Sequence, residues 1–437
     1  MPHPISILPF VFLLVLVAVG PLYFEKLWHR SYTYLTIFLG TVILAYYSIY
    51  LKDTEHCIHA VLEYVSFISL LAALFFASGG IIIRTDENGT PIANVMLLVI
   101  GAILASVIGT TGAAMVLIRP FINLNKNRLA AYQKVFFIFI VCNTGGLLTP
   151  IGDPPLFIGF LKGVPFFWIF LKTLPFWLLS NGLLIGLFYY IDKTKNPIQF
   201  DNSPGILNLK IKGFKNIFFL FITLIVVFLD PNIAGMEWLP CIHLEGTKLS
   251  FIREIILLVM CFLAYKYTDK ALLKKNDFTI APIKEVAFIF FGLFMTMMPV
   301  IEWIEHLVSR PELGHLVNKN ILFWSTGLLS AILDNAPTYL DSMSAALGSV
   351  NLDINRPNDV LQFLASPAFV DVVAISVSSV IFGAFSYLGN APNLMVKAIA
   401  EQKGVKMPSF FEYIIKYSIP ILLPIVFLNW LLLLLLY

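Results

Sequence analysis

The stretch CNTGGLLTPIGDPP, residues 142–155, interrupts an apolar run that extends from residue 134 to residue 161. Its paired glycines and three prolines do not support a continuous α-helix, so the sequence predicts a helix that is broken at membrane depth. A second apolar run, 369–402, is interrupted in the same way by SYLGNAP at 386–392. Lipid cannot satisfy the backbone groups that such breaks leave unpaired, so each break must be buried in protein or line a cavity.

The composition of the chain is that of a membrane protein. Of its 437 residues, 59% are hydrophobic and 13% are charged, whereas a soluble domain has about 25% charged residues. So few charges cannot cover a water-facing surface, and an aromatic content of 14% excludes a disordered chain. The sequence therefore predicts an all-α polytopic membrane protein.

Several kinds of chemistry are excluded by the sequence. The four cysteines and seven histidines lack the spacing of a disulfide scaffold or a zinc site. There is no G-x-x-x-x-G-K-[ST] loop that would bind a nucleotide, so transport must be coupled to ion gradients. We expect no enzyme activity, no cofactor, no metal beyond Na⁺ and no nucleic-acid partner.

The chain divides into two halves of the same plan. Each half has three spans, an interrupted hairpin, a broken helix and a final span. LASVIGTTGA (104–113) aligns with LSAILDNAPT (329–338), and GLLTPIGDPP (146–155) aligns with GAFSYLGNAP (383–392). Two matches in the same order predict an internal duplication. The expected parts are a first repeat at 1–192 with hairpin 92–120 and broken helix 134–161, a linker at 193–215, and a second repeat at 216–437 with hairpin 321–347 and broken helix 369–402.

Charge distribution predicts how the halves are oriented. Lys and Arg gather in four loops, whereas the other loops, including 348–368, are mixed or acidic. The basic loops share one side of the membrane only if both hairpins are re-entrant and turn back inside it. Five crossings per half then give the two repeats opposite orientations. We expect the basic side to be the cytoplasm of a bacterial inner membrane and both termini to lie outside. The basic loops are 126–134, 193–215, 266–275 and 403–406.

The residues at the breaks favour a cation. Unwound carbonyls and half-helix C-termini attract cations in secondary transporters. Each half supplies one carboxylate, Asp153 or Asp334, to a cluster of neutral oxygens, which suits Na⁺. We expect two such clusters, in which a proton and a cation compete for each carboxylate. The candidate ion-binding residues are Thr110, Thr111, Asn143, Thr149, Asp153, Asp334, Asn335, Ser386 and Asn390.

Other roles stay open for the charged residues in the spans. Asp153 and Asp334 could each only cap the helix that follows. Asp341 could relay protons, and Glu63 could be a relay or a helix–helix hydrogen bond. Three lysines could snorkel to the interface or contact a carboxylate substrate; they are Lys162, Lys172 and Lys397.

Two motifs resemble those of a known superfamily. CNTGGLLTPIGDPP resembles the broken-helix signature of NhaD-type sodium/proton antiporters. SAILDNAP (330–337) resembles the hairpin tip of those antiporters and of arsenite permeases. Both belong to the ion transporter superfamily, which also contains citrate and dicarboxylate carriers. The resemblance covers 95–160 and 325–400. It implies inverted repeats with re-entrant hairpins, a homodimer with a scaffold and a mobile transport domain, and ion-site roles for Asn143, Thr149, Asp153, Asp334 and Asn335.

The sequence departs from these relatives at the first hairpin tip and at the second break. GTTG at 109–112 lacks the Ser-Asn-Thr triplet of dicarboxylate carriers, and GNAPN at 389–393 is not the usual antiporter continuation. The leading expectation is a Na⁺/H⁺ antiporter. The alternative is a Na⁺-coupled citrate or dicarboxylate symporter whose tip amides and hydroxyls bind the carboxylates. An arsenite-type permease is a minor variant, and a membrane scaffold or channel without coupled transport is a third hypothesis.

Overall fold

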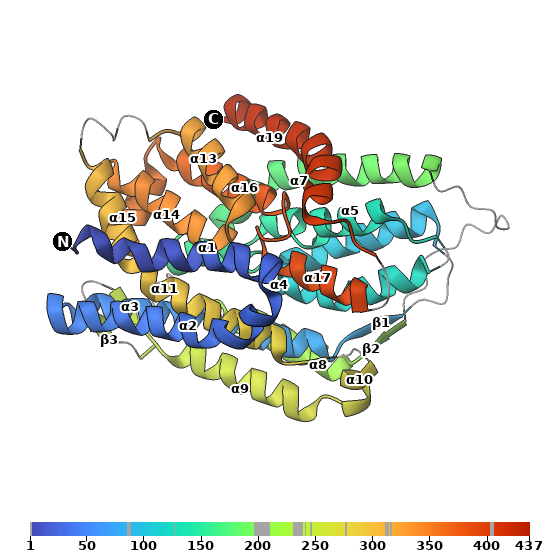
Figure 1. Ribbon diagram of the computed structural model, residues 1–437, viewed down its shortest axis with the longest axis horizontal. Helices are drawn as coiled ribbons and strands as arrows, with labels where there is room; N and C mark the ends of the chain where they lie inside the picture. The colour runs from blue at the N-terminus through green and yellow to red at the C-terminus, as the bar shows by residue number, and fades with distance from the viewer. Residues whose placement is uncertain are drawn as a thin grey trace.

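Long α-helices lie roughly along the longest axis of the computed structural model and form an elongated bundle (Figure 1). In the described part of the chain, seven helices are apolar and long enough to span a membrane, or eight if a pair bent by 103° counts as one span. The chain is therefore an integral, all-α polytopic membrane protein. The structure describes residues 2–84, 89–126, 128–195, 210–229, 239–240, 242–244, 247–275, 278–310, 314, 317–402 and 406–437.

The first half contains seven α-helices among its described residues, of which α4 and the pair α5 and α6 lie close to the predicted hairpin 92–120 and broken helix 134–161. They are α1 (Leu8–Tyr23), α2 (Glu25–Ala45), α3 (Thr54–Gly79), α4 (Pro91–Leu124), α5 (Ala131–Val141), α6 (Pro154–Leu161) and α7 (Phe166–Lys195). Short helices precede α1, extend α2 and follow α5; they are η1 (Pro4–Ile7), η2 (Tyr46–Leu51) and η3 (Thr144–Leu148).

The second half repeats this sequence of long and broken helices. Its helices are α8 (Phe214–Val226), α9 (Ile252–Tyr267), α10 (Lys270–Lys275), α11 (Ala281–Val308), α13 (Lys319–Ile332), α14 (Asn335–Gly348), α15 (Pro357–Ala365), α16 (Phe369–Gly383), α17 (Ala391–Gln402), α18 (Phe410–Tyr413), η4 (Ile414–Leu422) and α19 (Leu423–Leu436). Two antiparallel pairs are the only described strands: β1 (Ile82–Arg84) with β2 (Lys210–Lys212), and β3 (Ile242–Leu244) with β4 (Thr247–Leu249).

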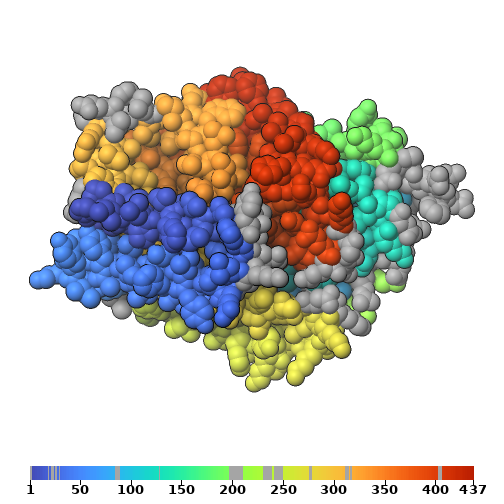
Figure 2. All heavy atoms as spheres, in the orientation of Figure 1, coloured from blue at the N-terminus to red at the C-terminus, as the bar shows by residue number. Residues whose placement is uncertain are grey.

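Figure 2 shows the two sides of the bundle. The first helices (blue) lie next to the yellow segment around α9 and α10, whereas the orange and red segments of the second half form the other side. Helices α5 and α16, which lead into the two breaks, are almost entirely buried, whereas the first arm of each hairpin, in α4 and α13, keeps one exposed apolar face. Such burial is where breaks in a membrane helix are tolerated.

The four basic loops meet at one end of the bundle. Pairing of β1 with β2 brings the end of the linker beside the end of α3. Arg128 pairs with Asp192 in the last turns of α7, and Lys134 donates a hydrogen bond to the carbonyl of Lys406. Phe278, just after α10, packs against the last turns of α3. The charges therefore share one end, as the sequence predicts.

Both termini lie at the opposite end. Trp303, near the end of α11, donates a hydrogen bond from Nε1 to the Pro2 carbonyl. Lys172, in the early turns of α7, lies over the ring of Tyr437 at 4.9 Å. Because α7 starts here and ends beside the basic loops, its length separates the termini from those loops.

Helix α4 folds back on itself at Gly109, where φ is 78° and ψ is 153°. Asn94 and Asn125, near its two ends, exchange side-chain hydrogen bonds of 2.9 and 2.6 Å. A straight helix would hold them roughly 46 Å apart. Although α4 is long and apolar enough to count as a span, its two ends lie together, so it does not cross the bundle.

Helices α13 and α14 make the corresponding hairpin in the second half. Thr326 donates a hydrogen bond of 2.7 Å to Ser342 across the two helices. Asp334 lies midway between them in sequence, just as Gly109 lies midway between the two asparagines of α4. The two turns are therefore at positions that the sequence alignment pairs.

A buried network closes the α4 hairpin, and it supports a prediction about stability. Asp192 is fully buried and accepts hydrogen bonds from Arg128, Tyr132, Gln133 and Asn94 at 2.6 to 3.1 Å. Asp192→Ala removes the acceptor of the buried Asn94 and Gln133 amides and the ion-pair partner of Arg128, which costs about 3–5 kcal/mol. We expect a clear drop in the melting temperature of the purified protein.

The exposed neighbour Lys193 provides the control for that prediction. Lys193→Ala removes only a side chain that lies 5.8 Å from the Tyr189 ring at the surface, so its melting temperature should match the parent. Equal melting temperatures for both variants would show that the network contributes nothing to stability.

One segment folds differently from the sequence prediction, and parts of two predicted segments lie outside the described residues. The stretch 348–368 was expected to be a loop, but it contains α15, which meets α16 at 103°. Pro357 at its first position and the alternation of polar and apolar residues explain this short helix. Residues 196–209 of the predicted linker and 403–405 of the last basic loop lie outside the described residues. The division into two inverted repeats stays a prediction.

Candidate functional site

The first break is built by glycines and prolines. Helix α5 ends at Val141, a short 3-10 turn follows, and α6 begins with Pro154 and Pro155. Gly146 and Gly152 face each other so closely that a Cβ on Gly152 would lie 2.1 Å from the Gly146 carbonyl oxygen. Only glycine permits this contact, which turns the chain and presents Asp153 at the start of α6.

Each hairpin tip binds the break of its own half by the same backbone hydrogen bond. The Thr110 amide donates to the Gly152 carbonyl at 2.8 Å, and the Asn335 amide donates to the Gly389 carbonyl at 3.1 Å. The sequence alignment pairs Thr110 with Asn335 and Gly152 with Gly389. The two contacts are therefore equivalent, and they place four interrupted segments around one point.

Asp153 lies at that point. Its carboxylate is 1% exposed. Oδ1 accepts hydrogen bonds from Thr110 Oγ1 at 2.9 Å and from Asn390 Nδ2 at 2.8 Å, and Oδ2 accepts one from Asn335 Nδ2 at 2.7 Å. The donors come from both hairpins and from the other break. Residues of both halves therefore contact the Asp153 carboxylate. One of them, Asn390, is the residue that the sequence alignment pairs with Asp153.

Two oxygen atoms of this cluster lack a donor. The carboxamide oxygens of Asn335 and Asn390 are buried and have no hydrogen-bond partner in the structure. Buried acceptors are normally satisfied, so each unpaired one requires an explanation. A cation satisfies several acceptors at once, whereas an anion would add more acceptors. The charge and the unpaired oxygens therefore fit a small cation.

A second layer of amides holds the breaks in place. Asn143 donates from Nδ2 to Asn393 Oδ1 at 2.8 Å, and its own Oδ1 accepts from Asn390 at 3.3 Å. Asn393 donates to the carbonyls of Gly383 and Ser386, both at 2.9 Å. Asn393 was not among the nine candidate residues, although its position just after GNAP, inside the second break, was a signal that could have selected it.

Two of the remaining candidates, Thr149 and Ser386, make hydrogen bonds to backbone groups and not to Asp153. Thr149 donates to the Ser106 carbonyl at 2.5 Å, and Ser386 accepts from the amides of Leu388 and Gly389. Thr111 is half-buried and has no described hydrogen bond to the cluster.

Asp334 caps α14. Its Oδ1 accepts a hydrogen bond from the Ala336 amide at 3.0 Å, whereas Asp153 makes no side-chain capping bond to α6. The described hydrogen bonds thus form one cluster around Asp153, not the two expected, because the tip asparagine of the second half turns to Asp153 and leaves Asp334 on its own helix.

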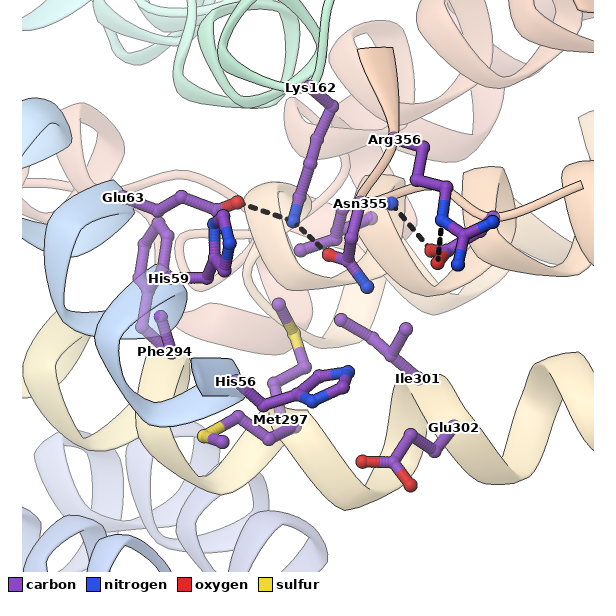
Figure 3. Close-up of a pocket in the computed structure, with 14 residues that line it drawn as sticks. His56, His59, Glu63, Lys162, Phe294, Met297, Ile301, Glu302, Asn355 and Arg356 are labelled. Atoms are coloured by element: carbon purple, nitrogen blue, oxygen red, sulfur yellow. Dashed lines mark hydrogen bonds and ion pairs between the residues drawn. The ribbon is translucent and has the colours of Figure 1, made fainter. Parts of the chain in front are cut away.

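A cavity of about 220 Å³ lies at the end of the bundle that holds the termini (Figure 3). Its walls come from α3, the end of α6, α11 and the segment between α14 and α15. Apolar side chains of α11 supply much of its lining, and its charged and polar lining residues are His56, His59, Glu63, Lys162, Glu302, Asp353, Asn355 and Arg356.

Lys162 connects three of these walls. Its ammonium is 2.6 Å from Glu63 Oε1 and 2.6 Å from Asn355 Oδ1, and the residue is 4% exposed (Figure 3). The lysine is therefore buried and paired and does not snorkel, and Glu63 forms an ion pair. The other two lysines lie over aromatic rings, Lys172 over Phe369 and Lys397 over Tyr387.

Asp53, in the turn before α3, holds His56 beside this cavity. Burial raises the pKa of Asp53, but hydrogen bonds and the charge of His56 outweigh it, so the pKa lies below its usual range. The ion pair of 2.8 Å therefore stabilises the fold above the ordinary carboxyl pKa and is lost as pH falls through the lowered value.

The comparison with known families matches nearly the whole chain. A family model described as “Putative citrate transport” matches residues 2–434. A search of the curated proteins finds no match. The match includes every element of the Asp153 cluster and both halves of the bundle. The chain belongs to this citrate-transport family of membrane transporters.

Proposed function

We propose that the protein is a secondary active transporter that binds Na⁺ at Asp153 and exchanges it for protons. The observation that carries the proposal is the buried Asp153 carboxylate beside two asparagine oxygens that lack donors. A buried carboxylate costs several kcal/mol unless a countercharge or hydrogen bonds compensate it. A bound Na⁺ supplies both the countercharge and a partner for the unpaired oxygens.

The asparagines suggest how the site fills and empties. Without an ion, their amino groups donate to Asp153. Rotation of each carboxamide by about 180° exchanges the donor for an acceptor, so the same side chains then offer oxygens to Na⁺. Asn335 and Asn390 thus have two alternative states: in one they donate hydrogen bonds to the Asp153 carboxylate, and in the other their oxygens bind the cation.

The placement of the site supports alternating access. Hairpin tips and breaks from both halves meet at Asp153, so movement of these segments against the outer helices would open the site to one face or the other. We propose that the basic end faces the cytoplasm of a bacterial inner membrane and that the termini lie outside. A homodimer with the outer helices as scaffold is part of this proposal.

A second candidate is a Na⁺-coupled symporter of citrate or a dicarboxylate. The family description favours it. In that case Na⁺ would occupy the same site, and its charge would attract the substrate carboxylates. The amides and hydroxyls of the hairpin tips would supply donors once Na⁺ had released them from Asp153.

One pair of experiments separates the two candidates. Purified protein is reconstituted in proteoliposomes, and Na⁺ is added while internal pH is followed by a fluorescent dye. Collapse of an imposed pH gradient by Na⁺ without citrate supports the antiporter. Uptake of labelled citrate or succinate that requires Na⁺ supports the symporter, provided that Na⁺ moves no protons when citrate and succinate are absent. If the unmutated protein shows neither activity, the proposal of Na⁺ coupling is contradicted.

A further inference from the structure

Asp341 is a half-buried acid that the Asp153 cluster does not use. Its Oδ1 atom is buried and has no hydrogen-bond partner in the structure. The residue lies on α14, six residues after Asn335, which places it roughly 9 Å along the helix from the cation site. A carboxylate that is buried without a partner is costly, whereas the protonated acid is not. In this conformation Asp341 therefore suits a proton and not a metal ion.

Ser344 on α14 and Glu305 on α11 are the polar groups that follow Asp341 in the direction of the outer cavity. Ser344, one turn further along α14, donates to Glu305 Oε1 at 3.2 Å. Helix α14 packs tightly there, since a Cβ on Gly348 would lie 2.9 Å from Glu305 Cα. The charges of Lys162 and Asp353 act on Glu305, and both of those residues line the cavity.

The cavity favours protons and cations. The titratable and charged groups around this route come from every wall, and carboxylates outnumber lysine and arginine among them. On α11 they are Glu302, Glu305 and His306; on α3, His56, His59 and Glu63; at the end of α6, Lys162; and between α14 and α15, Asp353 and Arg356.

We propose that Asp341 carries the proton of the exchange, that Glu305 loads it from the outer cavity, and that Asp153 carries the cation. The two ions then occupy different carboxylates of one unit, since Asn335 and Asp341 belong to the same helix. Movement of α14 couples them. The inference rests on the proposed Na⁺/H⁺ exchange and names its proton site.

The test compares the full-length protein with Asp341→Asn in two assays. Binding of ²²Na⁺ in detergent should stay within about 3-fold of the parent, because the substitution is isosteric and distant from Asp153. Na⁺-driven proton movement in proteoliposomes should fall at least ~10-fold, because Asn cannot bind the proton. Retained Na⁺ binding also shows that the variant is folded.

Three further variants make the outcome specific. Glu305→Gln should keep Na⁺ binding and slow proton movement most at low proton concentration, with a changed pH profile. Asp153→Asn should lose both activities, and Asp371→Asn, at the start of α16, should lose neither. Proton movement by Asp341→Asn equal to that of the parent overturns the inference and leaves the Asp153 proposal intact. A parent protein that neither binds Na⁺ nor moves protons overturns both.

Discussion

Asp153→Asn should abolish Na⁺-coupled transport. The substitution keeps the shape of the side chain but removes its charge and replaces one acceptor oxygen with an amino group. That amino group would face the donors Thr110, Asn335 or Asn390, which now point at the carboxylate. Loss of a buried countercharge of this kind costs about 3–5 kcal/mol, so the affinity for Na⁺ should fall by at least ~100-fold.

The measurement is Na⁺-dependent flux in proteoliposomes, with Asp371→Asn as the matched control. Asp371 is also an acid of a broken segment, but it lies in the first turn of α16, far along that helix from the break. Its variant should transport like the parent. Because a neutral Asn removes a desolvation cost from the ion-free protein, Asp153→Asn should still fold and elute as the parent does. Full transport by this variant would exclude Asp153 as an ion ligand.

Gly152→Ala should prevent the first break from forming. Its Cβ would lie 2.1 Å from the Gly146 carbonyl oxygen, which is a backbone atom that cannot rotate away. The chain between η3 and α6 would have to shift, and the Thr110 amide would lose its bond to the Gly152 carbonyl. We expect a loss of more than about 3 kcal/mol in the free energy of unfolding, seen as poor accumulation or a large drop in melting temperature.

Gly182→Ala is the control for that substitution. Gly182 lies inside α7, and nothing lies within 4 Å of the added methyl group. Alanine is favoured over glycine in a helix by about 1 kcal/mol, so this variant should be as stable as the parent or more stable. If the two alanine variants unfold at the same temperature, the close approach at Gly152 is not what shapes the break.

The sequence predicts the membrane helices well because each one depends on local composition. Apolar runs end at charges, Pro or Gly, and the helices begin and end near those residues, as at Pro91 and Lys195. Both breaks are predictable for the same reason, since Gly146, Gly152 and Pro154 in the first and Gly389 and Pro392 in the second disfavour a continuous helix. The amphipathic α15 was missed because it is too short to give a span-length apolar run.

The site was only partly predictable because its contacts join distant segments. The alignment places Thr110 and Asn335 at paired hairpin tips and Asn390 in the second break. It cannot show that all three donate to Asp153, because that depends on which asparagine rotamer reaches across the bundle. Asp334 illustrates the limit, since it is the acid that the second half supplies, as Asp153 is in the first half, but it caps its own helix.

The unequal tips explain why one carboxylate is central. At the first tip, Gly109 takes a left-handed conformation with φ of 78°, whereas its counterpart Asp334 has φ of −62° and starts a helix. The two halves therefore present different side chains to the same point. Convergence of the donors Thr110, Asn335 and Asn390 on one carboxylate is consistent with binding of one monovalent cation.

Equilibrium binding of ²²Na⁺ to single-site variants tests the central claim most directly. Alanine replacements of Asn335 and Asn390 should each weaken Na⁺ binding by about 10-fold or more, because each removes an oxygen ligand. Ser386→Ala removes only a bond to its own turn and should bind Na⁺ like the parent. Parent-like affinity in the asparagine variants, or an equal loss in Ser386→Ala, would contradict a cation site centred on Asp153.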